Sequence, residues 1–420
     1  MKLVRTGGRA ARAEQLLKEL EQRRVAASDS VLPVVRRIVG GVRRGGDRAL
    51  RRYAAKLDAL PPQLQLRITR EEMCRGWEET PASLQNAMRA AAKNIRAFAE
   101  RQMPTEWSSA VAPGLVTGQV VRAVESAGCY VPSGRYPLPS TLLMTVIPAQ
   151  VAGVKRIVVV SPRPARETLA AAWMLGVDEF YRVGGAQAIA ALAYGTESLE
   201  KVDKIVGPGN LYVTAAKKLV AFDCSIDMLA GPTEIVVTSE RGNPAAVASD
   251  LVAQAEHDPE ALPIFVTTVE TLAIRVIAEV RERVKCNPTA HQSVKKNGVV
   301  FLAASAEEAR EITNRLAPEH LTVDAEADLK WVRNAGSVFV GRYSPQPMGD
   351  YVSGPNHTLP TGTMARVRGG LSVLDFVKIV TVQRYTRQGL AELAPAAIAL
   401  AEAEGLTGHA EAIRARGIRG

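Results

Sequence analysis

Short runs of β-branched residues alternate with helix-length segments between residues 156 and 342. The runs are RIVVVSP (156–162), DEFYRVGG (178–185), DKIVGPG (203–209), TEIVVTS (233–239), PIFVTT (263–268), GVVFLA (298–303) and GSVFVGR (336–342). Because parallel strands need a long crossover between them, usually a helix, this alternation is typical of βαβ units. The sequence therefore predicts an α/β protein built on mostly parallel, doubly wound sheets.

The runs form two groups, so we expect two sheet domains with helical segments at both ends of the chain. The predicted parts are an N-terminal helical arm at 1–26, a discontinuous Rossmann-like domain at 27–129 and 237–378, an inserted Rossmann-like domain at 130–236, and a C-terminal helical tail at 379–420. Apolar residues at helical spacing in the arm predict an amphipathic helix. A helix this short is stable only when it packs on a body or a partner.

Composition excludes several classes of protein. Of the 420 residues, 47% are hydrophobic and 23% are charged, so the chain can bury sizeable cores and is not disordered. No apolar run approaches the roughly 20 residues of a membrane span, and MKLVRTGGRAARAEQ lacks the apolar stretch of a secretory signal. Cys74, Cys129, Cys224 and Cys286 form no C-x-x-C pair, which favours the reducing cytoplasm over a disulfide or thiolate-zinc scaffold.

The net charge of +10 raises the alternative of a nucleic-acid-binding protein. Aromatic residues are only 5% of the chain, so platforms for base stacking are few. The densest basic stretch, RRIVGGVRRGGDRALRR (36–52), is interrupted by apolar residues at helical spacing. We therefore predict no nucleic-acid partner and attribute the charge to the steering of an anionic ligand.

Histidine is scarce, and His257 lies beside a second candidate ligand. It follows Gln254 by one helical turn in 244–259, which we expect to be a helix that ends at Pro259. Imidazole is a common zinc ligand and an amide oxygen a less usual one. On these residues alone, a half-buried histidine at a helix end is the more frequent arrangement.

Glu319 and His320 are neighbours in NRLAPEHL (314–321). A carboxylate beside an imidazole offers two bases of different strength: the carboxylate can activate water while the imidazole takes a hydroxyl proton. The alternative is a surface helix that starts with Pro318 at its first position and Glu319 in its first turn.

Two further polar pairs follow along the chain. The loop GDYVSGPNHTLPT (349–361) contributes His357 and Asp350, which is a suitable oxygen ligand for zinc but is also a common turn residue. The segment EAEGLTGHAEA (402–412) places Glu404 and His409 in the tail. Such a pair is usually solvated, unless the tail docks against its own chain or a partner.

Two glycine-rich turns follow strands of the first group, in VGGAQAIAALAYG (183–195) and VGPGNLYVTAAKK (206–218). A strand, glycines and then a helix aim backbone N–H groups at a phosphate. Neither turn has the dinucleotide fingerprint G-x-G-x-x-G, so a nucleotide is indicated only weakly. Tyr130 could stack on a ligand ring, whereas Cys129 beside it is interpreted as buried and inert.

Together these segments resemble the histidinol dehydrogenase family, whose members are zinc enzymes that complete histidine biosynthesis. The motifs that carry the resemblance run in order from about residue 120: VGGAQAIAALAYGTESLEKVDKIVGPGNLYVTAAK, DMLAGPTEIVV, DLVAQAEHDPEA, RLAPEHL, AGSVFVG, GDYVSGPNHTLPT, GLSVLDF and AEAEGLTGHAEAIRAR. The resemblance implies incomplete Rossmann-like domains, the inserted one binding NAD, and a cytoplasmic homodimer with a shared active site and a swapped tail.

The resemblance also implies a role for each polar residue. Zinc would be held, one ion per subunit, by Gln254, His257, Asp350 and His409 of the partner subunit. The catalytic pair would be Glu319 and His320. The substrate would be contacted by His320, by the four zinc ligands, and by Thr233, His357 and Glu404. NAD contacts would come from Tyr130, Gln187 and Asn210.

The implied reaction is the oxidation of L-histidinol to L-histidine through L-histidinaldehyde with two NAD. His320 would take the hydroxyl proton in the first step, and Glu319 would activate water in the second. The sequence departs from the family at Ser133, where glycine is common, and in MARVRGGLS after the His357 loop. The alternative is a paralogous NAD-dependent dehydrogenase of another polar alcohol, such as a sulfonated diol. Glu404 and His409 argue against it, because they would serve an imidazole substrate.

Overall fold

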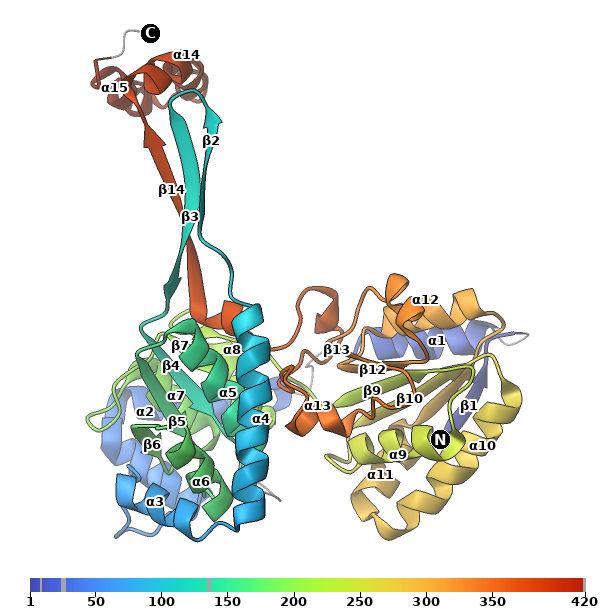
Figure 1. The fold of residues 1–420 in the computed structure, drawn as a ribbon. Coiled ribbons are helices and arrows are strands. Elements are labelled where there is room, and N and C mark those ends of the chain that lie inside the picture. The colour runs from blue at the N-terminus through green and yellow to red at the C-terminus, as the bar shows by residue number, and fades with distance from the viewer. Residues whose placement is uncertain (8–9, 24–27, 134–136, 418–420) are drawn as a thin grey trace. The chain divides into compact units, whose positions relative to one another are not determined.

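The computed structural model describes residues 1–7, 10–23, 28–133 and 137–417 (Figure 1). Contacts between Cα atoms divide the chain into a larger unit, Met1–Gln102 with Glu125–Phe376, and a smaller unit, Met103–Val124 with Val377–Gly420. No helix among the described residues is long and apolar enough to cross a membrane.

Two parallel sheets form the larger unit, which confirms the predicted α/β class. In the described chain the first sheet has the order β1-β11-β10-β9-β12-β13, with parallel neighbours throughout. Its strands are β1 (Lys2–Arg5), β9 (Glu234–Thr238), β10 (Leu262–Thr267), β11 (Val299–Leu302), β12 (His320–Val323) and β13 (Ser337–Val340). Its helices are α1 (Ala10–Glu21), α9 (Pro244–Ala255), α10 (Glu270–Arg283), α11 (Pro288–Asn297), α12 (Ala306–Leu316) and α13 (Pro347–Tyr351).

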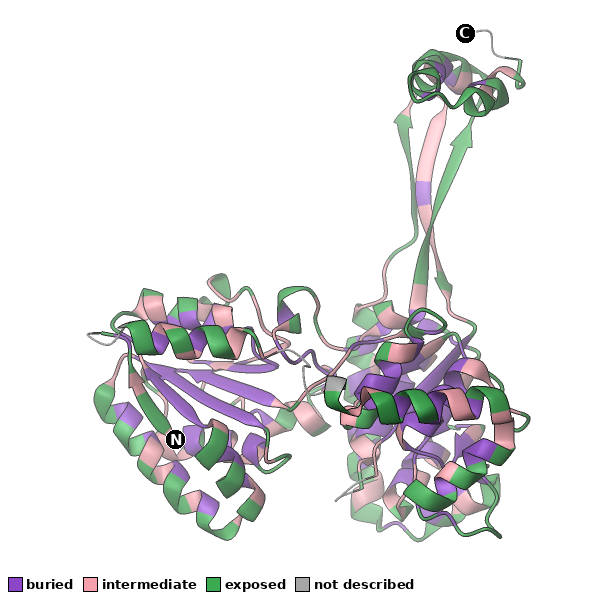
Figure 2. Ribbon diagram, turned by 180° about the vertical axis from the view of Figure 1, so that it is seen from behind, coloured by how far each residue is buried: buried purple, intermediate pink, exposed green. Residues whose placement is uncertain are grey.

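Helices cover both faces of this first sheet, because its strands are apolar on both sides. Ile235 and Val237 of β9 pack in a core with α9, α10 and α11. Val236, between them, joins the opposite core, where Leu17 of α1 and Ile312 of α12 lie. Successive side chains of a strand point to opposite faces of the sheet, so neighbouring residues of β9 enter different cores. Figure 2 shows the strands of both sheets as mostly buried. The predicted N-terminal arm thus packs on this sheet through α1, and it also supplies the edge strand β1.

The second sheet has the order β6-β5-β4-β7-β8 in the described residues and is also parallel. Its strands are β4 (Ser126–Tyr130), β5 (Arg156–Val160), β6 (Glu179–Tyr181), β7 (Lys204–Val206) and β8 (Ser225–Ile226). Its helices are α2 (Ser28–Leu57), α3 (Arg70–Glu78), α4 (Ala82–Arg101), α5 (Pro139–Ala152), α6 (Arg166–Met174), α7 (Gly185–Tyr194) and α8 (Leu211–Val220).

Helices α2, α3 and α4 lie in a part of the chain that we expected to join the domain of 237–378. They pack instead around the second sheet: α2 against α7 and α8, α3 against α6, and α4 against α5. Val42 and Leu50 of α2 share a buried core with Ile189 and Leu192 of α7. An apolar stripe predicts that one face of a helix packs against a core, but it does not identify the sheet to which that core belongs.

The smaller unit contains an antiparallel sheet and two helices. Its elements are β2 (Trp107–Ala112), β3 (Leu115–Ala123), β14 (Val377–Tyr385), α14 (Arg387–Ala403) and α15 (Thr407–Arg414). Strand β14 pairs with β3 along its whole length. The predicted C-terminal tail is therefore helical only after β14. Gly405, with φ of 75°, separates the two helices.

Candidate active site

The amino ends of β9 and β12 bring the predicted catalytic pair to adjacent positions. Glu319 directly precedes β12 and His320 begins it, opposite Ile235 of β9. Ala317 and Pro318 form the turn before them, and Ala317 has φ of 44°, a left-handed conformation that costs an L-residue about 1–2 kcal/mol. Glu319 and His320 are 7% and 3% exposed, so the alternative of a surface helix start is wrong.

The carboxylate of Glu319 is buried and accepts two hydrogen bonds. Thr233 Oγ1 donates to Glu319 Oε2 over 2.6 Å, and the Glu234 N–H donates to the same oxygen over 2.9 Å. Burial raises the pKa of Glu319 to about 7, against the opposing effects of the His320 charge and these two hydrogen bonds. A carboxylate with this pKa can exchange a proton near neutral pH, as a general base must.

The imidazole of His320 is oriented through one ring nitrogen. Its Nδ1 lies 3.1 Å from the carbonyl oxygen of Glu234, which can only accept, so Nδ1 carries the proton and Nε2 is the basic nitrogen. Nε2 lies 3.7 Å from Asp350 Oδ1. Burial lowers the pKa of His320, but the carboxylates of Glu319 and Asp350 outweigh it and raise the pKa above its usual value.

Asp350 and His357 extend this network from the loop that follows β13. Asp350 lies in α13 and accepts from Gln346 Nε2 over 2.9 Å. Burial favours a higher pKa for Asp350, but its hydrogen bonds and the charges of His320 and His357 leave the pKa below normal. His357 Nδ1 donates to the Asp350 carbonyl over 2.8 Å, and its Nε2 lies 3.2 Å from Thr141 Oγ1. Burial lowers the pKa of His357.

Gln254 joins the same network and keeps one atom unpaired. Its Nε2 donates to Thr233 Oγ1, and its Oε1 is buried with no hydrogen-bond partner in the described structure. Helix α9 ends at Ala255, earlier than predicted, so His257 lies exposed in the turn after it. The charge of His257 nevertheless contributes to the lowered pKa of His357.

Two of these groups are oxygen donors of the kind that a metal ion takes. A buried, unpaired amide oxygen and the ionised Asp350 are both oxygen donors suited to a divalent cation. Across the residues that the structure describes, no three His, Cys, Asp or Glu side chains are grouped to hold a metal. Glu404 and His409 lie exposed in the smaller unit, and their part in a shared site stays a prediction.

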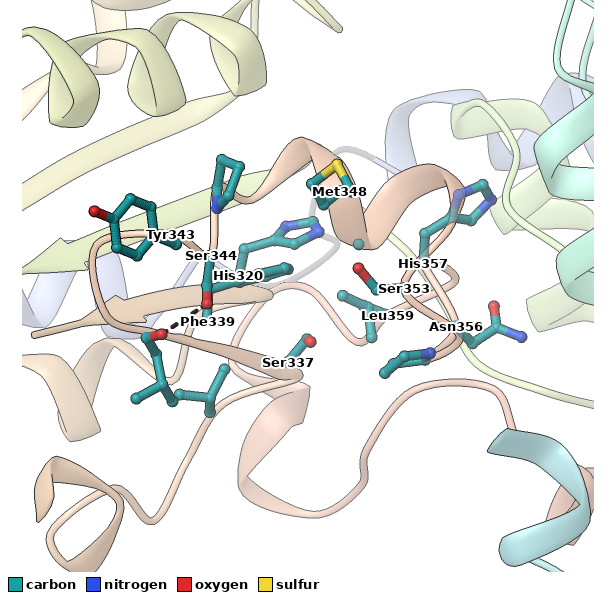
Figure 3. Close-up of a pocket in the computed structure, with 15 residues that line it drawn as sticks. His320, Ser337, Phe339, Tyr343, Ser344, Met348, Ser353, Asn356, His357 and Leu359 are labelled. Atoms are coloured by element: carbon teal, nitrogen blue, oxygen red, sulfur yellow. Dashed lines mark hydrogen bonds between the residues drawn. The ribbon is translucent and has the colours of Figure 1, made fainter. Parts of the chain in front are cut away.

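A cavity of about 420 Å³ opens beside His320. Figure 3 shows the His320 and His357 side chains among its lining residues, with Phe339 next to His320. The rings of His320 and Phe339 are stacked with centroids 6.1 Å apart. Apolar neighbours such as Phe339, Met348 and Leu359 limit the water around the imidazole.

At the first glycine turn, between β6 and α7, the N–H groups of both glycines are already paired. The N–H of Gly184 donates to Asp58 Oδ2 over 3.0 Å, and that of Gly185 donates to the hydroxyl of Tyr130 over 3.1 Å. Gln187 Nε2 donates to the same Asp58 oxygen, and Gln187 Oε1 is buried without a partner in the described residues. The ring of Tyr130 packs in the core instead of being open for stacking.

The second glycine turn, between β7 and α8, is held by a buried ion pair. The side chains of Lys217 and Asp227 are 3% and 0% exposed and contact each other. Lys217 Nζ donates to the Gly207 carbonyl over 2.9 Å, and the Gly207 N–H donates to Asp227 Oδ2 over 2.8 Å. Gly207 has φ of 113°, and a Cβ there would lie 2.2 Å from the Tyr130 carbonyl oxygen. Asn210 caps α8 and is exposed.

Ser133, where the family commonly has glycine, is accommodated without a left-handed backbone. It is not among the described residues with positive φ, and its Oγ accepts the Arg163 N–H over 2.9 Å. Cys129 is fully buried, and burial raises its pKa to about 12, in keeping with an inert thiol.

Sequence reasoning missed several polar residues that hold these sites: Arg23, Asp58, Lys217, Asp227 and Glu234. Only Glu234 carried a signal, since it is the one charged residue of a strand that is buried along its whole length. The partners of Arg23 and Asp58 lie more than a hundred residues away in the chain.

Comparisons with known proteins agree on one family. The profile of the family described as histidinol dehydrogenase matches residues 21–417. The histidinol dehydrogenase of Methanothermobacter thermautotrophicus is 46% identical over 413 residues, which cover 95% of this chain and 96% of that protein. The Bacillus subtilis histidinol dehydrogenase is 45% identical and covers 93% and 94%. The crystal structure of the histidinol dehydrogenase from Elizabethkingia anophelis superposes with a TM-score of 0.93 at 34% identity, covering 99% of this chain and 98% of that one.

Proposed function

The chain belongs to the histidinol dehydrogenase family, and we propose that it oxidises L-histidinol to L-histidine with zinc and two NAD. One observation carries the proposal. The predicted residues Gln254, Thr233, Glu319, His320, Asp350 and His357 form one continuous polar network at the amino ends of β9 and β12. The family name identifies an oxidoreductase, and the network supplies the bases that such an oxidation needs.

In the first oxidation the proton of the substrate alcohol goes to His320. Nδ1 is held by the Glu234 carbonyl, so Nε2 takes the hydroxyl proton while a hydride leaves the carbon that bears the hydroxyl group. The alcohol becomes an aldehyde, and NAD, when bound, accepts the hydride. The neighbouring carboxylates of Glu319 and Asp350 stabilise the imidazolium that forms.

In the second oxidation Glu319 activates a water molecule. The carboxylate removes a water proton as the oxygen attacks the aldehyde carbon, and the aldehyde oxygen takes the proton that His320 received in the first oxidation, which gives the hydrate. A second hydride then leaves that carbon while His320 Nε2 takes a proton from one hydroxyl of the hydrate, and the carboxylic acid is formed; a second NAD, when bound, would accept the hydride. The pKa of about 7 lets Glu319 act as a base at neutral pH and release its proton between turnovers.

Zinc would be held by Gln254, His257, Asp350 and His409 of the partner subunit in a homodimer. When bound, the metal supplies a Lewis acid that orients the imidazole and amino groups of the substrate. The unpaired Gln254 Oε1 supports this set, because a buried amide oxygen without a partner costs about 1–3 kcal/mol. Thr233, His357 and Glu404 would contact the substrate.

NAD would bind at the second sheet, through Tyr130, Gln187 and Asn210. Gln187 Oε1 is an unpaired acceptor beside the first glycine turn, and Asn210 is exposed at the amino end of α8. The hydroxyl of Tyr130 lies at the same turn, where it accepts a hydrogen bond from the Gly185 N–H. These positions support a dinucleotide at the carboxyl ends of the strands, the usual location in open α/β sheets.

The test is NADH formation from L-histidinol by the purified protein. We expect two NADH per L-histidinol, loss of turnover after chelation, and recovery with added zinc. Absence of NADH with the metal-loaded protein would contradict the proposal. Turnover of a sulfonated diol without turnover of L-histidinol would instead favour the paralogous dehydrogenase.

A further inference from the structure

Glu234 touches both members of the catalytic pair through its backbone. Its N–H donates to Glu319 Oε2 over 2.9 Å, and its carbonyl lies 3.1 Å from Nδ1 of His320. The position of this one residue therefore sets the orientation of the carboxylate and the tautomer of the imidazole. A shift of Glu234 would move both bases together.

The side chain of Glu234 is anchored by Arg23, which follows α1 in the N-terminal arm. Arg23 Nε and Nη2 each donate over 2.8 Å, one to each carboxylate oxygen of Glu234. The two side chains are 15% and 5% exposed. A planar guanidinium in this fork geometry fixes the carboxylate in direction as well as in distance.

The same ion pair joins two more segments that shape the site. Arg23 Nη2 also donates to the Leu316 carbonyl over 2.6 Å, at the end of α12 and just before the turn that carries Glu319. Glu234 Oε1 accepts the N–H of Gly362, which lies beyond His357 in the same loop. Three segments of the candidate site thus converge on one charged pair.

We propose that Arg23 and Glu234 are positioning residues, through which the N-terminal arm holds Glu319 and His320 in their reactive arrangement. The inference rests on the proposed function. Neither residue needs to touch the substrate, because Arg23 acts through Glu234 and Glu234 acts through its own peptide groups. A misplacement of the bases by a fraction of an ångström lowers turnover without weakening substrate binding.

The decisive variant is Arg23→Lys, which keeps the positive charge but loses the two-pronged contact. We expect kcat with L-histidinol to fall about tenfold to a hundredfold, while KM for L-histidinol and NAD and the zinc content stay within twofold of the unaltered enzyme. The double variant Arg23→Met/Glu234→Gln removes both charges and should show the same loss of kcat, even where Arg23→Met alone does not fold.

Two control variants separate positioning from general loosening of the arm. Arg12→Lys alters an exposed residue of α1 and should leave kcat unchanged. Glu14→Gln weakens the contact between Glu14 and Arg315, which joins α1 to α12, without touching Glu234. An equal loss of kcat in Glu14→Gln would overturn the inference.

An unchanged kcat in folded, zinc-loaded Arg23→Lys would also overturn it. Inactivity of the unaltered enzyme toward L-histidinol would instead count against the proposed function itself. In that case the NMR chemical shift of the His320 Nδ1 proton still tests the positioning role. This chemical shift should change in Arg23→Lys and stay the same in Arg12→Lys. An unshifted proton in Arg23→Lys would refute the positioning role.

Discussion

Two buried bases, Glu319 and His320, lie at the start of β12, whereas at the two glycine turns of the second sheet three glycine N–H groups donate to side chains and Gln187 Oε1 stays unpaired in the described residues. Gln254 Oε1 has no partner among the described residues, and Glu319 has a pKa of about 7. In contrast, the N–H groups of Gly184, Gly185 and Gly207 donate to Asp58, Tyr130 and Asp227.

The two regions also use opposite ends of their sheets. The glycine turns follow β6 and β7, at the carboxyl ends, where open α/β sheets usually bind ligands. Glu319 and His320 lie at the amino ends of the first sheet. On the proposed function, the edge with Glu319 and His320 is the reactive edge, whereas at the other edge three glycine N–H groups are held by hydrogen bonds to side chains, an arrangement that we call the frame. The fold class alone does not identify the reactive edge.

The largest expected effect is at the reactive edge, in Glu319→Gln. An amide cannot remove a water proton, so we expect NADH formation to fall by about 10²–10⁴-fold with zinc retained. His320 remains able to take the alcohol proton, so the aldehyde should accumulate and be trapped with a hydrazine reagent. Normal production of L-histidine by this variant would show that Glu319 is not the base.

The sequence was enough to propose this pair, whose catalytic role stays a prediction, but it did not reveal the residues around the pair. Neighbouring Glu319 and His320 were proposed from the order of the family-like motifs, and each of the β-branched runs coincides with all or most of a strand, such as β9 in TEIVVTS. Strand β12 itself was missed because two of its four residues, His320 and Thr322, are polar, so it lacks an apolar run. Arg23 carried no signal, because it meets Glu234 across 211 residues of chain. Pairings of this kind depend on packing, which a linear pattern does not contain.

The second prediction concerns the frame around the glycine turns. Lys217→Met leaves Asp227 charged and buried without its partner, so we expect a loss of about 3–5 kcal/mol in the free energy of unfolding, measured with urea. In folded enzyme KM for NAD should rise while KM for L-histidinol changes little. Lys155→Met, at an exposed lysine before β5, is the matched control. A loss confined to L-histidinol binding would contradict the division between the two edges.

The third prediction follows from the pKa of Glu319 and applies to stability. Because the folded-state pKa is raised from 4.5 to about 7, the folded protein holds this proton more tightly than the unfolded chain does. The resulting stability is fully present below about pH 4.5 and is lost as the pH rises through 7, by about 3 kcal/mol in total. The amide of Glu319→Gln does not titrate, so this variant lacks the pH-dependent contribution of Glu319 to stability.

Urea unfolding of metal-free protein at pH 5 and pH 8 measures this effect. The stability of Glu319→Gln relative to the unaltered protein should increase between the two pH values, and this difference reports Glu319 together with His320, whose pKa the Glu319 carboxylate raises. A relative stability that does not depend on pH would show that Glu319 titrates normally, and the reactive edge would then lose its contrast with the paired edge.

The smallest expected effect is at Ser133, beside the second sheet. Ser133→Gly removes the acceptor of the Arg163 N–H, which water can replace because the bond is exposed, and it adds backbone freedom to the unfolded chain. Together these changes lower the free energy of unfolding by about 1 kcal/mol. KM for NAD should change less than twofold, since the glycine turns are held by Asp58 and Asp227 and not by Ser133. A larger change in KM for NAD, with stability unaltered, would mean that Ser133 contacts the cofactor directly. The hydrogen bonds of the glycine turns would then not be enough to hold the NAD site in shape.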